Sequence, residues 1–378
     1  MSDDKEQISV TANERALSQA LKYVVGADQA AILPSIVNPK LVLPLCGLRL
    51  RWRLSKFYPA FSIRAKPWRM LQRFRALFGL VSKLSDQNNE KLHQFIYEIF
   101  PDITHTSVLL GTPGPTRKII VQLWAGKQMV GYLKVATTVA AAEKIQTETN
   151  VLEKLPEGCG PKLLKYSDLD GNKAMLLSLV EGEMLNASLL AITPEDGGIM
   201  VELNTYLERL NVRDDTFAIG DHPAIVRLRE GVAGDRGAGK GEISHQSSVI
   251  RLQGFEEIIF PLRKRTWPLV IQHGDFAPWN VFRLPDGSLC SIDWEEGCVE
   301  GFPFFDLIHF IGQTAFLCQK WSQKRTLDYL YETLRPMLGS SASSIIKLGL
   351  LSSYVSLQQT VGDDHPIQKW RKDMWEID

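Results

Sequence analysis

The sequence is poor in cysteine, and its few cysteines lie far apart. They are odd in number and form no C-x-x-C pair: Cys46, Cys159, Cys290, Cys298 and Cys318. This pattern argues against a disulfide framework and a cysteine-based zinc site, and it is typical of proteins in a reducing compartment.

The sequence also lacks a long uninterrupted apolar run. Its most apolar early stretch, from Ala30 to Leu50, is broken by prolines and polar residues (Pro34, Asn38, Pro39, Lys40 and Pro44). Such a stretch is a poor candidate for a membrane-spanning helix. The first residues, Met1 to Glu6, are acidic and polar, so they do not predict a signal peptide. Together with the cysteine pattern, these features predict a cytoplasmic protein.

A net charge is absent as well. Lys plus Arg and Asp plus Glu number 43 each in 378 residues, so the overall charge predicts no polyanionic partner. A hydrophobic content of 44% and a charged content of 23% are those of an ordinary globular protein. The length allows two or three domains with sizeable cores.

One part of the chain contains no acidic residue. Between Asp28 and Asp86 basic residues accumulate (Lys40, Arg49, Arg51, Arg53, Lys56, Arg64, Lys66, Arg69, Arg73, Arg75 and Lys83). Aromatic residues are interleaved with them (Trp52, Phe57, Tyr58, Phe61, Trp68, Phe74 and Phe78). Residues 12–24 have helical periodicity. We therefore interpret residues 1–102 as a basic, helical N-terminal extension.

Two interpretations of the basic, aromatic block remain open. In the first, residues 49–83 form an amphipathic surface that contacts anionic lipid at the periphery of a membrane, or another anionic ligand. In the second, the basic face is solvated and the aromatic stripe packs on the core. We favour the second, because apolar stripes at helical spacing are usually core. Nothing resembles a nucleic-acid-binding module, so we expect no nucleic-acid partner.

Residues 103–136 are rich in β-branched and apolar residues. Ile103–Leu110, Lys118–Trp124 and Gln128–Ala136 predict three antiparallel strands, and turns at 111–116 and 125–127 join them. Two further strands are predicted around the turn at 168–172. This part of the chain therefore predicts a β-rich unit.

The third of these strands carries one lysine, Lys134, in an otherwise apolar pattern. Val139–Leu155 predicts a helix that offers Glu143 and Glu148 as acidic partners for Lys134. By itself, such a strand lysine is more often part of a surface ion pair.

The stretch from Pro268 to Trp294 places polar residues among short apolar strands. Val281–Arg283 and Ser288–Ile292 predict a hairpin, which returns Asp293 to the neighbourhood of Asn280. An amide oxygen and a carboxylate together suit Mg²⁺, and Asp275 is then free to face a substrate hydroxyl. The spacing from Asp275 to Asn280 matches that of protein-kinase-type phosphoryl transfer.

Three segments together carry a family resemblance: His273-Gly274-Asp275-Phe-Ala-Pro-Trp-Asn280, Ile292-Asp293-Trp294-Glu295 and Gly301-Phe-Pro-Phe-Phe-Asp306-Leu. This combination resembles the aminoglycoside phosphotransferase and choline kinase-like family of small-molecule kinases. The resemblance implies a two-lobed, protein kinase-like α+β fold. We expect a β-rich small lobe at 103–180 and a mostly helical large lobe at 181–378, with ATP between them.

The resemblance also implies roles for individual residues. Asp275 is the expected catalytic residue, and Asn280 and Asp293 are the expected Mg²⁺ ligands. Lys134, held by Glu148 rather than by Glu143, is expected to contact the ATP phosphates. The remaining expected residues are Gly111 and Gly114, in a loop that covers the phosphates, and His273 and Asp306, which support the catalytic loop.

These features predict an ATP-dependent phosphotransferase that acts on a hydroxyl group of a small molecule. The basic, aromatic block favours a sugar, a polyol or a saccharide intermediate as acceptor. An aminoglycoside or a choline- or ethanolamine-type amino alcohol is the alternative. A catalytically silent nucleotide-binding scaffold is disfavoured, because Lys134, Asp275, Asn280 and Asp293 are all present.

A glycine- and serine-rich loop is predicted at residues 231–248, beside the substrate. Within it, Gly234 to Gly241 imitates a Walker A loop, but Gly241 stands where that motif requires Ser or Thr. We therefore expect no Walker A site here.

Overall fold

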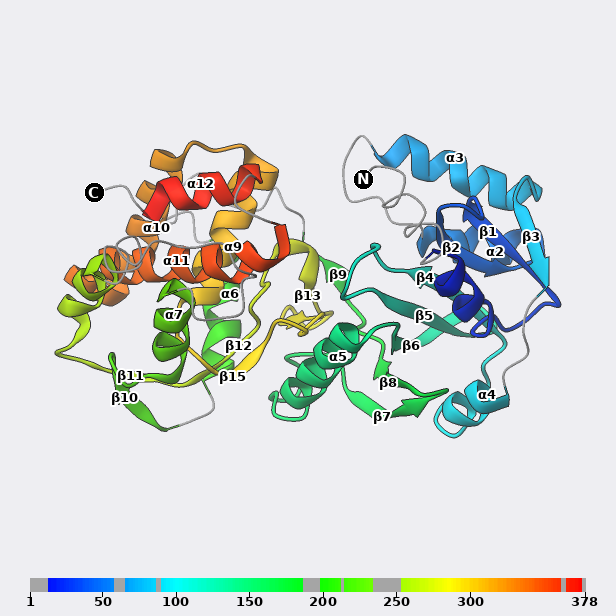
Figure 1. Cartoon of the computed structure of the whole chain (residues 1–378), viewed down its shortest axis with the longest axis horizontal. Coiled ribbons are helices and arrows are strands. Elements are labelled where there is room, and N and C mark those ends of the chain that lie inside the picture. The colour runs from blue at the N-terminus through cyan, green and yellow to red at the C-terminus, as the bar shows by residue number, and fades with distance from the viewer. Residues whose placement is uncertain are drawn as a thin grey trace. The chain divides into compact units, whose positions relative to one another are not determined.

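The computed structural model describes residues 13–57, 65–85, 90–185, 198–211, 214–233, 253–361 and 365–375. The chain forms two compact units (Figure 1). Unit 1 comprises Met1–Thr149 and Lys162–Leu179, and unit 2 comprises Asn150–Pro161 and Val180–Asp378. None of the described helices combines the length and the apolar character that are needed to cross a membrane.

Unit 1 is built on one antiparallel sheet of eight strands, in the order β3-β1-β2-β4-β5-β6-β8-β7. The strands are β1 (Gln29–Pro34), β2 (Pro39–Pro44), β3 (Ser82–Ser85), β4 (His105–Leu110), β5 (Lys118–Ala125), β6 (Gln128–Ala136), β7 (Leu163–Leu169) and β8 (Asn172–Ser178). The three antiparallel strands predicted between residues 103 and 136 are confirmed as β4, β5 and β6.

The strands β1, β2 and β3 differ from the expectation of a purely helical N-terminal segment. β1 and β2 are short apolar runs that end in prolines, a length and composition that suit buried strands better than helices. β2 pairs with β4, with Val42 opposite Val108, so the N-terminal strands continue the same sheet. The boundary of the extension at residue 102 stays a prediction.

Helices cover both faces of this N-terminal half of the sheet. These helices are one at residues 13–21, α2 (Leu48–Leu54), α3 (Ala65–Phe78) and α4 (Glu90–Tyr97). A further helix, α5 (Val139–Leu152), follows β6. Ala30 and Ile32 of β1 pack in the core that includes the helix at 13–21 and α4. Ala31 and Leu33 alternate with them and pack in a second core that includes Leu54 of α2. Burial of both faces explains why β1 is apolar at successive positions.

The helix α3 is oriented opposite to our expectation. Its aromatic residues are exposed, with Trp68 at 49%, Phe74 at 44% and Phe78 at 68%, whereas its polar Gln72 is fully buried. Arg73 packs its guanidinium group 3.8 Å from the centre of the Trp52 ring of α2. For α3, the prediction that the aromatic stripe packs on the core is therefore wrong: the arginines Arg73 and Arg75 and the buried Ala76 attach this helix to the unit. Phe57, which precedes α3, does pack against the core.

Unit 2 is mostly helical. Its helices are α6 (Gly198–Arg209), α7 (Pro223–Ala233), one at residues 253–259, α9 (Phe305–Gln313), α10 (Gln323–Leu338), α11 (Ala342–Val361) and α12 (Pro366–Trp375). Its short strands are β9 (Glu183–Met184), β10 (Thr216–Ala218), β11 (Thr266–Pro268), β12 (Val270–Gln272), β13 (Val281–Arg283), β14 (Leu289–Ser291) and β15 (Cys298–Gly301). The predicted α+β fold, rich in strands first and in helices later, is confirmed. Most of the loop expected at 231–248, with its Walker-like sequence, lies outside the described residues.

The fold predicts a large effect of Thr106 on stability. Its buried hydroxyl donates to Tyr23 O at 2.7 Å and accepts from Val25 N at 2.8 Å, which ties the segment after the first helix to β4. We expect Thr106→Val to lower the free energy of unfolding by about 1–3 kcal/mol, because it leaves two backbone groups without their partner. Denaturant unfolding measures this change. The matched control is Thr116→Val at an exposed turn, and equal effects of the two changes would contradict the assignment.

Candidate active site

The predicted catalytic loop connects two strands of unit 2. β12 leads into His273, and a short 3₁₀ turn at Pro278–Asn280 leads into β13. β13 and β14 form the predicted hairpin, with Val281 opposite Ser291. Ile292 N donates to Asn280 O at 2.9 Å, so the hairpin brings the residue before Asp293 into contact with Asn280.

Asp306, near the start of α9, holds the backbone of this loop. Its carboxylate accepts from His273 N at 2.6 Å and from Gly274 N at 3.0 Å. Burial raises the pKa of Asp306 to about 7, although the two backbone N–H groups oppose this shift. Gly274 has a φ of +81°, and a Cβ atom there would collide with the backbone oxygen of Glu296. Only glycine allows the loop to pass so close.

His273 is fully buried and uses both ring nitrogens within the loop region. Nε2 lies 2.9 Å from Ile292 O, and Nδ1 accepts from Asp275 N at 3.3 Å. Burial lowers the pKa of His273, so the ring is neutral and Nε2 carries its proton. In this arrangement His273 links the catalytic loop to the strand end that precedes Asp293.

The side chain of Asp275 is accessible, with 39% of it exposed, whereas Asp306 is buried. Asn280 Nδ2 donates to Asp275 O at 2.9 Å and to Asp275 Oδ2 at 3.2 Å. These bonds use the amide nitrogen of Asn280, so its carbonyl oxygen is the atom available for a cation. The spacing of five residues thus brings both predicted residues together.

Asp293 has a backbone conformation that non-glycine residues seldom adopt, with a φ of +70°. Such strain is often found at functional positions. A carboxylate oxygen of Asp293 lies within 4.8 Å of one of Glu295. The donors Asn280, Asp293 and Glu295 offer oxygen only, and this donor chemistry fits Mg²⁺. Our sequence interpretation did not include Glu295 among the ligands, although it lies two residues after Asp293.

Lys134 and Glu148 meet inside unit 1. Lys134 Nζ donates to Glu148 Oε1 at 2.7 Å and to Oε2 at 2.8 Å, from β6 to α5. The side chain of Glu148 is fully buried and that of Lys134 is 9% exposed. A buried ion pair adds little stability relative to apolar packing, so its value lies in fixing the position of the ammonium group.

The two predicted loop glycines differ in their surroundings. A Cβ atom at Gly111 would lie 2.8 Å from Lys118 O, so the turn after β4 requires glycine there. Gly114 is exposed and has nothing within 4 Å of a Cβ position. Thr138 donates to Pro115 O and accepts from Ala141 N at 3.0 Å, which ties this loop to the beginning of α5. The geometry therefore requires glycine at one of the two positions.

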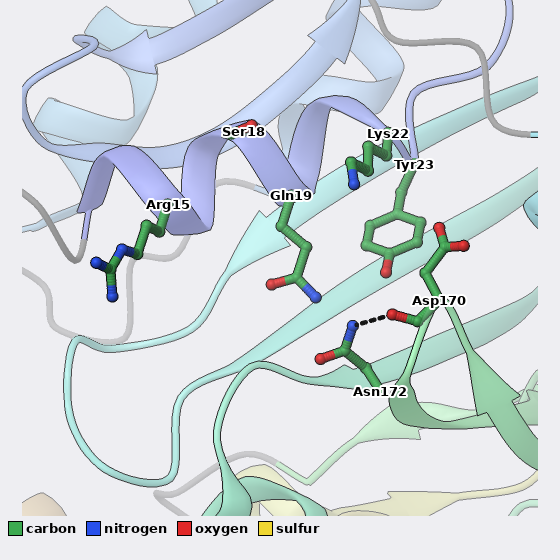
Figure 2. A pocket seen from close by; sticks show the side chains of 7 residues that line it. All are labelled: Arg15, Ser18, Gln19, Lys22, Tyr23, Asp170 and Asn172. Atoms are coloured by element: carbon green, nitrogen blue, oxygen red, sulfur yellow. Dashed lines mark hydrogen bonds between the residues drawn. The ribbon is translucent and has the colours of Figure 1, made fainter.

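Unit 1 also has a cavity of about 300 Å³ that involves none of the predicted site residues (Figure 2). Arg15, Gln19 and Lys22 line one side, and Asp170 and Asn172 line the other. The cavity belongs to the surface between the first helix and the β7–β8 turn.

The sequence interpretation missed the residues that lie behind Asp275. His309 of α9 and Arg371 of α12 are both buried, and His309 Nε2 lies 3.3 Å from Asp275 Oδ1. A signal for His309 existed, because it follows Asp306 by three residues and so shares its helix face. No such signal existed for Arg371, almost a hundred residues from Asp275.

Comparison with known proteins identifies the family. Residues 117–335, more than half of the chain, match the model described as the phosphotransferase enzyme family. The chain belongs to this family, and it is a small-molecule kinase. A search of curated proteins found no match.

Solved structures of small-molecule kinases are similar to this chain. An ethanolamine kinase of Plasmodium vivax is 12% identical, covering 87% of this chain and 94% of its own, with a TM-score of 0.45. A choline kinase of Streptococcus pneumoniae is 16% identical, covering 76% and 96%, with a TM-score of 0.46. An aminoglycoside phosphotransferase of Streptomyces rimosus is 16% identical, covering 65% and 92%, with a TM-score of 0.38. All three TM-scores are below 0.5, so the assignment rests on the family match.

The site predicts a pH-dependent stability that originates at Asp306. Because its pKa rises on folding from 3.8 to about 7, its contribution is fully present below pH 3.8 and is lost as the pH approaches 7. We expect the free energy of unfolding of the wild type, relative to Asp306→Asn, to fall across this window by up to about 1.4 kcal/mol per pH unit. Denaturant unfolding at several pH values measures the difference. A difference independent of pH would contradict the shift.

Proposed function

We propose that this chain transfers the γ-phosphate of ATP to a hydroxyl of a sugar, a polyol or a saccharide intermediate. The observation that carries the reaction type is the loop at Asp275, whose carboxylate is accessible while its backbone is fixed by Asp306. Phosphoryl transfer depends mainly on positioning and charge neutralisation, so a rigid loop with one accessible carboxylate suits it.

In the proposed reaction, Asp275 orients the acceptor hydroxyl and takes its proton. The hydroxyl oxygen forms a bond to the γ-phosphorus, the bond to the bridging oxygen breaks, and ADP leaves with that oxygen. Asn280 and Asp293 would hold Mg²⁺, and the ion would supply positive charge that neutralises the phosphate oxygens. Lys134, whose ammonium group Glu148 fixes, would contact the phosphates, and backbone N–H groups near Gly111 and Gly114 would cover them.

We expect Asp275→Ala to abolish phosphate transfer and to leave Mg-ATP binding largely intact, because Asp275 acts on the acceptor hydroxyl. Transfer is measured from radiolabelled ATP over a panel of sugars, aminoglycosides and amino alcohols, and binding is measured by calorimetry. The matched control is Glu332→Ala, which removes an exposed carboxylate of α10. Retention of most of the turnover in Asp275→Ala would contradict the role of this residue.

The exposed face of α3 supports an acceptor or partner at a membrane surface. Trp68, Leu71, Phe74 and Phe78 lie on one side of the helix and are each 44% exposed or more. The surrounding sequence from residue 29 to residue 85 contains basic residues and no acidic ones. An apolar, aromatic face with a basic surround suits an anionic bilayer surface, where aromatic rings enter the interface and basic groups meet the lipid phosphates.

This proposal unites the exposed helix with the predicted acceptor. A saccharide intermediate carried on a lipid presents its hydroxyls at the membrane surface. Docking through α3 would raise the local concentration of the enzyme at that surface. The proposal also explains why α3 buries Gln72 while it exposes its aromatic residues.

The full-length chain is therefore expected to bind vesicles that contain anionic phosphatidylglycerol and to bind neutral phosphatidylcholine vesicles more weakly. We expect Phe74→Ser with Phe78→Ser to lower the affinity about 10-fold or more. Full burial of a phenyl side chain contributes about 1.5–3 kcal/mol, and about half of each of these two side chains is still exposed and can be buried by the membrane. High salt should weaken the remaining binding. Co-sedimentation measures these effects, and Phe260→Ser, at another exposed phenylalanine, is the control. Equal binding of the double variant and the wild type would exclude docking through α3.

A further inference from the structure

The carboxylate of Asp275 is contacted from two sides. Asn280 Nδ2, within the loop, lies 3.2 Å from Oδ2. His309 Nε2, from α9, lies 3.3 Å from Oδ1. The side chain of His309 is only 7% exposed, whereas that of Asp275 is 39% exposed. One oxygen of the accessible carboxylate therefore meets a buried imidazole.

His309 and Asp306 act on the loop from the same helix face. They are three residues apart on α9, a spacing that places two side chains one above the other. Asp306 fixes the loop backbone at His273 and Gly274. His309 contacts the side chain of the next residue, Asp275. Together they control both the backbone and the side chain of the loop.

The C-terminal helices hold His309 in place. Its Nδ1 lies 2.9 Å from Ser353 Oγ of α11, and Ser353 O accepts from Arg371 Nη1 of α12 at 3.0 Å. The amide nitrogen of Gln313 lies 3.1 Å from His309 Nε2. Ser353 and Arg371 both follow residue 335, where the match to the family model ends. This part of the network is therefore a feature of this chain outside the matched segment.

One tautomer of His309 satisfies its contacts with Asp275 and Ser353. An ionised carboxylate can only accept a hydrogen bond, so the ring proton lies on Nε2 and points to Asp275. Nδ1 then accepts from the hydroxyl of Ser353. In this tautomer the amide of Gln313 turns its Oε1, which otherwise has no partner in the described part of the chain, toward Nε2, because two donors do not pair. Burial lowers the pKa of His309, and the positive charge of Arg371 lowers it as well. The hydrogen bond to the carboxylate of Asp275 acts in the opposite direction and raises it. The ring is therefore neutral and carries a single proton, on Nε2.

Arg371 adds a buried positive charge behind the loop. Burial lowers its pKa to about 10, and the negative charge of Asp275 opposes that shift, so the two charges interact. Its Nη2 atom has no hydrogen-bond partner in the described part of the chain. Burying an incompletely paired cation is costly. The electrostatic effect of Arg371 on Asp275 is a functional reason why a buried arginine is present at this position.

We propose that His309 is a positioning residue that holds the Asp275 carboxylate toward the acceptor hydroxyl, and that α11 and α12 keep it in place through Ser353 and Arg371. The proposal rests on the proposed function, because it assumes that Asp275 acts on the acceptor. It assigns a role in catalysis to helices that lie beyond the matched residues 117–335.

The contact itself is tested without any acceptor. In the full-length protein with ¹⁵N-labelled histidine, the His309 signals are those lost in His309→Gln. We expect them to show a neutral ring with its proton on Nε2, and to shift in Asp275→Ala. The His365 signals, from the beginning of α12, are the control and should not shift. A proton on Nδ1, or signals that do not respond to Asp275→Ala, would overturn the proposal.

The effect on catalysis is tested with the acceptor of highest turnover in the panel above. We expect His309→Leu to lower kcat about 10- to 100-fold, as loss of a supporting group does, with little change in the KM for ATP. His309→Gln keeps an N–H donor at similar reach and should recover most of the activity. Ser353→Ala, which removes one hydroxyl, should lower kcat less than His309→Leu does, and it serves as the test if His309→Leu does not fold. An unchanged kcat in both His309→Leu and Ser353→Ala, or a Gln variant as slow as a folded Leu variant, would overturn the proposal.

The two proposals fail in different ways. If the wild type transfers no phosphate to any acceptor, or if Asp275→Ala keeps its turnover, the proposed function fails and the role of His309 fails with it. If the wild type is active and Asp275→Ala is not, while His309→Leu keeps its kcat, only the role of His309 is excluded.

Discussion

The hydrogen bonds from two consecutive backbone N–H groups to Asp306 are the contacts on which the site of unit 2 depends. They fix the backbone at His273 and Gly274, and so they determine where the next residue, Asp275, can point. Such an arrangement requires glycine at 274, where a Cβ atom would collide with Glu296. It also requires a buried carboxyl group, whose desolvation is offset in part by the two donors. Rigidity at the loop is thus obtained at a cost in local stability.

Unit 1 shows a related compromise at α3. An ordinary surface helix buries its apolar stripe and exposes its polar residues. In α3, Gln72 is buried and Arg73 packs on Trp52, while large aromatic side chains face outward. Exposed apolar groups of this size are costly in water, and a membrane surface would remove that cost. The same unit contains the buried ion pair of Lys134 and Glu148, so the exposed face of α3 and this ion pair belong to one compact unit.

Local patterns in the sequence were sufficient for much of the fold and the site. Alternation and turn residues predict β4, β5, β6 and the β13–β14 hairpin, because strand pairing between neighbours depends on residues close in sequence. The pairing of Asn280 with Asp275 follows from a spacing of five residues. β1 and β2 pair with each other as a local hairpin, which the sequence interpretation missed. Their place in the sheet has no such local basis, because β2 pairs with β4, more than sixty residues away. A short apolar run between prolines has no local signal for such a partner.

By itself, the sequence determined the reaction type, since the residues from His273 to Asn280, Asp293 and Asp306 occur in a combination that the match to the phosphotransferase enzyme family supports. Only the tertiary structure decided which face of α3 is exposed and which residues lie behind Asp275. Helical periodicity places side chains on one face of a helix, but it does not say whether that face meets the core or the solvent. Likewise, the contacts of His309 with Ser353 and of Ser353 with Arg371 join helices distant in sequence, and only their packing brings these residues together.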